Sequence, residues 1–309
     1  MLSRPRISVI IVAYDMPREV PRTVQSFLAP YQQEMAPGDI EILVMENGSS
    51  RPVPEAVRAG WPANVRYFNI ENAPGSPAYA LNLGVAKARG KWVCPVIDGA
   101  RIATPGILRK AMLAARLSDC PVIATMGYHL GHVVQQEAVK QGYDAAAEDA
   151  LLDSIGWPQD GHRLFEIGCL GLSARKGWLA PIAESNAIIV SKAFYKAIGG
   201  YDERFDIPGG GIVNHDFFRR AVEHPDGLYV LLVGEGTFHQ HHGGVTTAKG
   251  VGKPAAPDGR TTWDIYADQY RQIRQMDYAV PQRAPLLFGD LGPSAVADVQ
   301  TFAGGERPE

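Results

Sequence analysis

The stretch KWVCPVIDGAR, residues Lys91 to Arg101, decides the fold. Its apolar run, Val93 to Ile97, ends abruptly on a single carboxylate, Asp98. A short apolar run bounded by turn-forming residues is typical of a strand that is buried on both faces of an α/β sheet. Ligands of such sheets bind beyond the carboxyl ends of the strands. We therefore expect Asp98 in a ligand site rather than as the cap of the next helix, because Thr104-Pro105 already supplies that cap.

Apolar runs and helical patterns alternate on both sides of this stretch. The predicted strands are 7–14, 40–45, 65–70, 91–97, 121–128 and 228–233, and the predicted helices are 17–28, 76–89, 105–117, 144–155, 191–198, 216–222 and 261–275. Strand and helix alternation over the first hundred residues predicts a parallel sheet with right-handed crossovers. The polar segment 132–163 interrupts this alternation and indicates an insertion, while the Pro-, Gly- and Ala-rich tail beyond Pro281 predicts a loosely packed arm.

The composition of the 309 residues narrows the class of protein. A formal net charge of −3 gives no electrostatic reason to expect nucleic acid as a partner. The three cysteines, Cys94, Cys120 and Cys169, lie far apart, which favours buried thiols in a reducing compartment. The chain shows no signal-peptide pattern and no apolar run near the ~20 residues of a membrane span. We expect a cytoplasmic protein, either free or peripheral at the inner face of the membrane.

Six short motifs follow one another in an order that resembles the family 2 glycosyltransferases. They are VIIVAY (9–14), ENGS (46–49), ALNLGVA (80–86) before GKW (90–92), VID (96–98), GGYDERF (199–205) and DFFRRA (216–221). Together they span about residues 7–245. The resemblance implies an inverting enzyme that moves a sugar from a nucleoside diphosphate sugar, UDP by default, to a saccharide or small-molecule hydroxyl in polysaccharide or glycoconjugate biosynthesis.

The same resemblance implies an α/β fold of the GT-A type, which is Rossmann-like. We expect a mostly parallel central sheet flanked by helices, with an acceptor-side insertion and a C-terminal helical arm. Residues 1–131 would form the nucleotide-sugar-binding half, residues 132–245 the acceptor-binding and catalytic half, and residues 246–309 a C-terminal helix and tail.

The resemblance assigns donor-binding residues to the first strand ends. Ala13 and Tyr14 would border the base, and Glu46 would accept a hydrogen bond from the base or ribose where the family usually has Asp. Asn82 would hold the ribose or the diphosphate loop, unless it is an ordinary surface residue of its helix.

Asp98 matches the first aspartate of the family's Asp-x-Asp signature, whose carboxylates help to hold a divalent cation on the diphosphate. Ala100 replaces the second aspartate, so the binding of Mn²⁺ or Mg²⁺ is expected to be weakened, moved or lost. Arg101 is either a fixed cation that faces the diphosphate or a solvated surface residue.

The cluster His239-Gln240-His241-His242 offers replacement ligands. Neutral imidazole suits Mn²⁺ better than Mg²⁺. His239 can share a site with His241 on an extended segment or with His242 on a helical turn. We expect Asp98, His239 and His242 to form the metal site.

The acceptor half carries the predicted base and acceptor contacts. An inverting transfer needs a base for the acceptor hydroxyl. Asp216 matches the usual base of the family, with His215 in place of the preceding acid, although an aspartate near a helix start also suits a cap. Glu184, Asn186 and His215 are the predicted acceptor contacts.

Three further side chains, Trp157, Trp178 and His162, could stack on or bond to a sugar acceptor, and core packing explains the two tryptophans equally well.

Three other classes of protein are alternatives to a glycosyltransferase. A sugar-phosphate nucleotidyltransferase would show a Gly-rich basic loop after the first strand, whereas this chain has Tyr14 to Arg18 there. A domain that holds nucleotide-sugar without catalysis would explain Ala100 and His215. A histidine-metal hydrolase is disfavoured because the sequence has no HExxH pattern.

Overall fold

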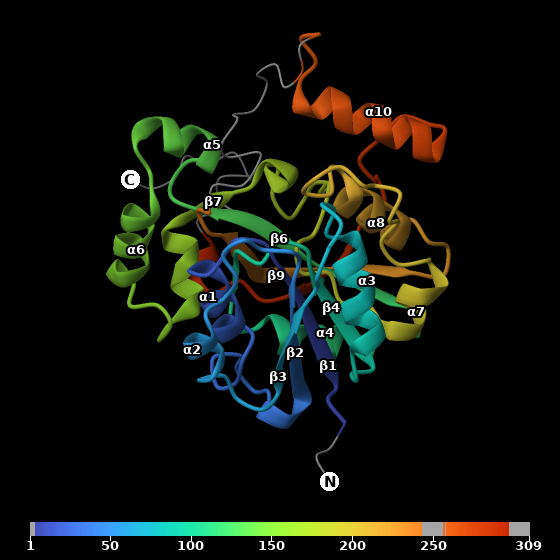
Figure 1. The fold of residues 1–309 in the computed structure, drawn as a ribbon. Coiled ribbons are helices and arrows are strands. Elements are labelled where there is room, and N and C mark those ends of the chain that lie inside the picture. The colour runs from blue at the N-terminus through green and yellow to red at the C-terminus, as the bar shows by residue number, and fades with distance from the viewer. Residues whose placement is uncertain (1–3, 243–255, 257, 297–309) are drawn as a thin grey trace.

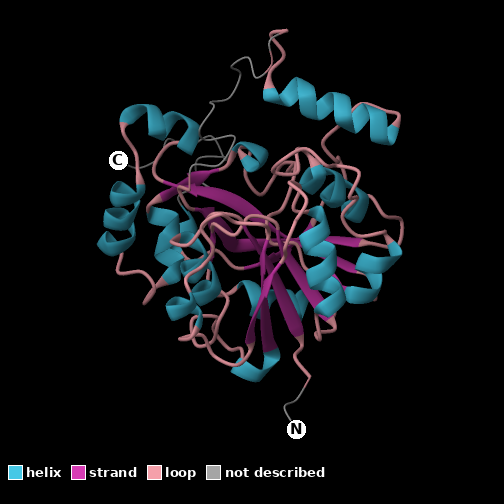
Figure 2. Ribbon diagram, viewed as in Figure 1, coloured by secondary structure: helices cyan, strands magenta, loops and turns pink. Residues whose placement is uncertain are grey.

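The computed structural model describes residues 4–242, 256 and 258–296. Figures 1 and 2 show strands in the centre of the molecule with helices packed around them. The mixed α/β architecture with mostly parallel strands confirms the predicted fold class.

The first sheet has the strand order β3-β2-β1-β4-β8. Its members are β1 (Ile7–Ala13), β2 (Ile40–Glu46), β3 (Val65–Asn69), β4 (Trp92–Val96) and β8 (Val190–Ser191). The first four strands are parallel, and β8 runs antiparallel to β4. Every residue of β1 and β2 is buried, which explains why these strands are continuous apolar runs rather than alternating ones.

The second sheet has the order β10-β9-β6-β7, with β5 also paired to β9. Its members are β5 (Arg101–Ala103), β6 (Pro121–Leu130), β7 (Gly168–Leu170), β9 (Leu228–His239) and β10 (Leu286–Gly289). An isolated bridge between Ile123 and Ile189 joins the two sheets beside β8. The carboxyl ends of β4 and β9 are thereby brought to one region of the molecule.

Nine α-helices are described around the sheets. They are α1 (Glu19–Ser26), α2 (Glu55–Arg58), α3 (Ala78–Lys87), α4 (Ile107–Ala114), α5 (Gln135–Ala138), α6 (Ala145–Ser154), α7 (Lys192–Ala197), α8 (Val213–Val222) and α10 (Thr262–Arg274). Side chains of α3 pack with Ile10 and Leu43 on one face of the first sheet, and side chains of α1 and α4 pack with Val9 and Val44 on the other. None of the described helices is both long and apolar enough to cross a membrane.

The structure corrects three predictions about strands. The last strand does not end at Val233 but continues as β9 to His239, because Gly234 adopts φ 72° and carries the strand past an irregularity in its pairing with β6. The strand β5 after Asp98 was not predicted, and the helix predicted from residue 105 begins only at Ile107. The tail beyond Pro281 is not wholly a loose arm, because β10 pairs in parallel with β9.

Candidate active site and metal centre

The pairing of β5 with β9 brings the Asp98 turn to the histidine cluster. Arg101 of β5 lies opposite His239, the last residue of β9, and the Gln240 N–H donates to the Ala100 carbonyl over 2.8 Å. Ala100 itself is fully buried in the apolar core, so an aspartate at this position would bury a carboxylate there. The substitution in the Asp-x-Asp signature therefore fits its surroundings, and His239 at the end of β9 lies beside the Asp98 turn.

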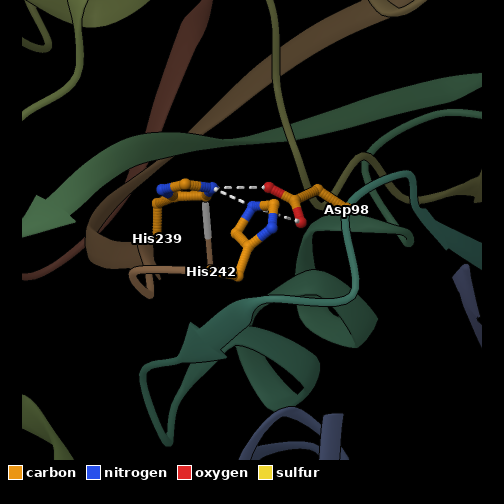
Figure 3. Close-up of side chains that lie close together, drawn as sticks. All are labelled: Asp98, His239 and His242. Atoms are coloured by element: carbon orange, nitrogen blue, oxygen red, sulfur yellow. Dashed lines mark hydrogen bonds and ion pairs between the residues drawn. The ribbon is translucent and has the colours of Figure 1, made fainter. Parts of the chain in front are cut away.

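Asp98, His239 and His242 point toward one another (Figure 3). The His239 Nε2 atom lies 2.9 Å from Asp98 Oδ2 and 3.0 Å from His242 Nε2, and the His242 Nε2 atom lies 3.7 Å from Asp98 Oδ1. One ligand atom from each residue fits within 4.8 Å of the others. The structure thus brings together the three predicted metal ligands.

Gln135 of α5 orients the His239 ring. Its Nε2 group donates to the His239 carbonyl over 2.8 Å, which leaves its Oε1 atom 2.6 Å from His239 Nδ1. An amide oxygen accepts, so the proton of a neutral imidazole sits on Nδ1 and the Nε2 lone pair faces Asp98. Burial lowers the pKa of His239 to about 4, despite the nearby Asp98 carboxylate, so the ring is neutral at pH 7.

The Asp98 carboxyl is ionised in this surrounding. Its burial opposes ionisation, but the positive charges of His239 and His242, in their protonated forms, and of Arg101 outweigh that effect and hold the pKa of Asp98 well below the usual value. The Arg101 Nε atom lies 3.4 Å from Asp98 Oδ2, and the Arg101 residue is 9% exposed, so it is not a solvated surface residue. A carboxylate and imidazole lone pairs that converge in this way fit a divalent cation of the Mn²⁺ type.

The insertion holds the histidine segment in place. The His241 N–H donates to Glu148 Oε2 over 2.7 Å, and Arg18 donates to the His241 carbonyl over 3.2 Å. Arg18 also pairs with Glu148 at 3.1 Å and with Asp149 at 2.6 Å. Helix α6 therefore positions the segment that carries His239 and His242, whereas His241 points to Tyr143 with ring centroids 6.1 Å apart.

The predicted donor residues of the first two strands meet at one edge. Ala13 lies opposite Glu46, and the Asn47 N–H donates to the Ala13 carbonyl over 2.8 Å. Tyr14 is 56% exposed and offers a free ring face beside this edge. The Glu46 side chain turns inward, where it accepts from Ser49, from Tyr67 over 3.1 Å and from the Val53 N–H over 3.1 Å. Its contact with a base or ribose stays a prediction.

Asn82 lies apart from this edge. Its amide donates to the Tyr201 carbonyl over 2.9 Å and to Glu203 over 2.8 Å, while its Oδ1 atom accepts from the Tyr195 hydroxyl over 2.7 Å. In the structure Asn82 therefore ties α3 to the loop that follows α7, and its predicted donor contact stays a prediction.

The acceptor residues form a separate group at the start of α8. The His215 Nδ1 atom lies 3.8 Å from Glu184 Oε2, and the Asn214 amide donates to the same oxygen over 2.6 Å. Asn186 is 4% exposed and lies beside β6. These positions agree with an acceptor site, which stays a prediction.

Asp216, the predicted base, is enclosed by two arginines. Its side chain is 0% exposed, and it accepts from Arg220 Nε over 2.8 Å and from Arg274 Nε over 2.6 Å. This ion-pair network joins α8 to α10. The predicted catalytic role of Asp216 is not tested by these contacts, but both carboxylate oxygens are already used in them.

Of the three further residues that could contact a sugar, Trp178 belongs to the protein interior, whereas Trp157 and His162 are only partly buried, and their contact with a sugar stays a prediction. Trp178 is 3% exposed and packs on Tyr128, with ring centroids 6.4 Å apart. Trp157 donates from Nε1 to the Tyr31 hydroxyl over 3.2 Å, and His162 lies 3.2 Å from Glu235.

Three residues near these sites were not predicted from the sequence: Gln135, Glu148 and Trp263. Gln135 and Glu148 lie in the polar insertion, where neither carries a recognisable motif. Trp263 is 50% exposed, and its ring lies 6.1 Å from that of His215. The sequence signal for an exposed residue was its position in the first turn of the helix, two residues after the capping Thr261.

The mixed α/β architecture is that of the GT-A fold. Residues 8–99 match the family model described as glycosyl transferase family 2, which confirms the predicted resemblance over this part of the chain. None of the curated proteins matches the chain.

Solved structures of S. aureus TarS are similar in fold. TarS 1-349 in complex with UDP-GlcNAc has a TM-score of 0.55 at 13% identity, with 87% of this chain and 65% of that chain covered. TarS 1-349 without a named ligand has a TM-score of 0.51 at 15% identity, with 76% and 60% covered, and its complex with UDP has a TM-score of 0.50 at 13% identity, with 77% and 61% covered. The chain thus spans less than two thirds of these relatives, and the likeness establishes the fold.

Proposed function

We propose that this chain transfers a sugar from a nucleoside diphosphate sugar, with UDP as the expected nucleotide, to an acceptor hydroxyl with inversion. The observation that carries the proposal is the convergence of Asp98, His239 and His242 near the carboxyl ends of β4 and β9. The family match over residues 8–99 and the TarS complexes with UDP and UDP-GlcNAc support a nucleotide-sugar donor. The expected products are polysaccharides or glycoconjugates.

The cluster would hold Mn²⁺ or Mg²⁺, and the bound cation would neutralise charge on the leaving diphosphate. Two imidazole ligands favour Mn²⁺ over Mg²⁺. Arg101 adds a fixed positive charge beside Asp98, and the exposed ring of Tyr14 offers a stacking surface for the base.

Calorimetry with UDP, GDP and dTDP, each with and without Mn²⁺, tests the proposal. One nucleotide is expected to bind in a Mn²⁺-dependent way, and Asp98→Ala and His239→Ala are each expected to weaken that binding at least ~10-fold. Matched controls at exposed positions, Asp119→Ala and His132→Ala, are expected to bind as the native chain does.

Other outcomes discriminate between the alternatives. Equal binding without metal would assign the diphosphate to Arg101. Binding without turnover of any donor sugar would favour a domain that holds nucleotide-sugar without catalysis, which the enclosed Asp216 carboxylate also favours. Absence of binding to all three nucleotides would contradict the proposal and leave the resemblance as one of fold.

A further inference from the structure

Two carboxylates at the acceptor side differ in their availability to a substrate. Asp216 is 0% exposed and shared by two guanidinium groups, whereas the Glu184 side chain is 19% exposed. A general base must come within hydrogen-bond reach of the proton that it takes. On this criterion Glu184 is accessible and Asp216 is not.

Glu184 is held in a fixed position beside the second sheet. The neighbouring Ser185 hydroxyl accepts from the Thr125 N–H over 2.9 Å and donates to the Thr125 carbonyl over 3.0 Å. Thr125 lies on β6, the strand that pairs with β9 up to His239. The backbone at Glu184 is therefore anchored to the sheet that also carries the histidine cluster.

The Glu184 side chain is oriented as well. The Tyr201 hydroxyl donates to Asn214 Oδ1 over 3.1 Å, which directs the Asn214 amide N–H toward Glu184 Oε2 at 2.6 Å. The His215 Nδ1 atom approaches the same oxygen at 3.8 Å. The Ser173 hydroxyl is a further hydrogen-bond partner of the Glu184 carboxylate. The two oxygens of a carboxylate together offer about four acceptor positions, so these contacts orient Glu184 and leave room for a substrate hydroxyl.

The positive charge around Glu184 favours the ionised form of its carboxyl group, which is the form that can accept a proton. Burial raises the pKa of Glu184, but His215, the Asn214 amide and Arg101 outweigh burial and hold this pKa below its usual value. Arg101 also lowers the pKa of Asp98. The guanidinium of Arg101 thus acts on both carboxylates, the one in the metal cluster and the one at the acceptor side.

An aromatic wall borders this carboxylate. The His215 ring lies 6.1 Å from that of Trp263 and 5.6 Å from that of Tyr278, measured between centroids. Trp263 is half exposed, so its ring can pack against the apolar face of a sugar while polar groups of the sugar reach Glu184.

We propose that Glu184, rather than Asp216, is the general base, and that the acceptor sugar lies against Trp263. The inference rests on the proposed function. The Glu184 carboxylate takes the proton of the acceptor hydroxyl, whose oxygen forms a bond to the anomeric carbon. The bond from that carbon to the diphosphate oxygen breaks, its electron pair leaves with the nucleoside diphosphate, and Glu184 later returns the proton to water.

The test measures release of nucleoside diphosphate by the full chain with Mn²⁺. The probes are UDP-glucose, UDP-galactose, UDP-GlcNAc, GDP-mannose and dTDP-rhamnose, with water or p-nitrophenyl glycosides as acceptors. On the best donor, Glu184→Gln is expected to lower kcat at least ~100-fold while the Kd for the nucleotide stays within about twofold. Glu55→Gln, an exposed change of the same kind in α2, is expected to match the native chain.

Each outcome decides the question. If Glu184→Gln folds and keeps more than about a third of the native kcat, or if formate fails to restore turnover to Glu184→Ala, Glu184 is not the base. If Glu184→Gln does not fold, Glu184→Asp replaces it: a kcat lowered at least ~10-fold at unchanged Kd supports the inference, and an unchanged kcat overturns it. If the native chain binds none of the nucleotides, the proposed function fails, which is a different result from a failure of the Glu184 assignment. If the native chain binds a nucleotide but turns over no donor sugar, the assignment of Glu184 as general base is contradicted too.

Discussion

Asp98 and Asp216 are two aspartates at predicted functional positions, and their surroundings differ. Asp98 faces two imidazole rings, one of which presents a lone pair, and its side chain is 20% exposed. Asp216 faces two guanidinium groups and is 0% exposed. One guanidinium group, that of Arg101, lies beside Asp98 at 3.4 Å, whereas two guanidinium groups pair with Asp216 at 2.8 and 2.6 Å. The contrast teaches that the neighbours of a carboxylate, more than its place in a motif, decide whether it can bind or react.

The largest effect is expected at the enclosed carboxylate. Asp216→Asn removes the charge that compensates Arg220 and Arg274, so the free energy of unfolding is expected to fall by about 3 kcal/mol. Urea denaturation measures this change. In the matched control Glu223→Gln, which removes a partly exposed partner of Arg219, the expected loss is below about 0.5 kcal/mol. A loss under about 1 kcal/mol in Asp216→Asn would show that the ion-pair network is not a structural clamp.

The sequence could predict the strands whose residues are buried on both faces. β1, β2 and β4 are short apolar runs followed by turns, and their order defines the first sheet. The approach of His239 and His242 to Asp98 was also predictable, because the cluster follows an apolar strand. These features depend on local pattern and on the rule that strand ends carry ligands.

Other features depend on contacts between distant segments and have no local pattern. Gly234 resembles a strand end, yet a positive φ carries β9 onward to His239. Asp216 occupies a motif position, but Arg274 reaches it from a helix 58 residues away in sequence. Gln135 orients His239 across 104 residues. Such partners become visible only when the chain is folded.

The second largest effect is expected at Asp98. Asp98→Asn removes the anionic ligand but keeps a similar shape, so the affinity for Mn²⁺ is expected to fall about 100-fold, which corresponds to about 2.7 kcal/mol. Titration calorimetry with Mn²⁺ alone measures the affinity. Without metal, the free energy of unfolding is expected to fall by less than about 1 kcal/mol, in contrast to Asp216→Asn. Equal stability losses in the two variants would contradict the comparison.

A smaller effect is expected at Gln135, which orients His239, the imidazole next to Asp98. Gln135→Leu removes the acceptor that keeps the His239 proton on Nδ1, so the affinity for Mn²⁺ is expected to fall about 10-fold. Gln141→Leu, an exposed change nearby, serves as the control. If both variants bind Mn²⁺ as the native chain does, the ring orientation of His239 does not depend on Gln135.

Glu148 lies between these two cases: its side chain is fully buried, and within the described part of the chain it forms an ion pair with one cation, Arg18, which is itself a quarter exposed. Burial raises the pKa of Glu148 to about 7 from an ordinary value of 4.5, although the His241 N–H and Arg18 oppose the rise. Between these two values the folded state binds more protons than the unfolded state, so the contribution of Glu148 to stability is present below pH 4.5 and is lost as the pH rises through about 7.

Glu148→Gln should therefore become more stable relative to the native chain, by about 1 kcal/mol, between pH 5 and pH 6. Urea midpoints of the two proteins at both pH values measure this difference, with Glu55→Gln as the control. A difference that does not change with pH would mean that Arg18 keeps Glu148 ionised throughout. In that case Glu148 would resemble Asp216, and the insertion would hold the histidine segment through a permanent ion pair rather than a titrating one.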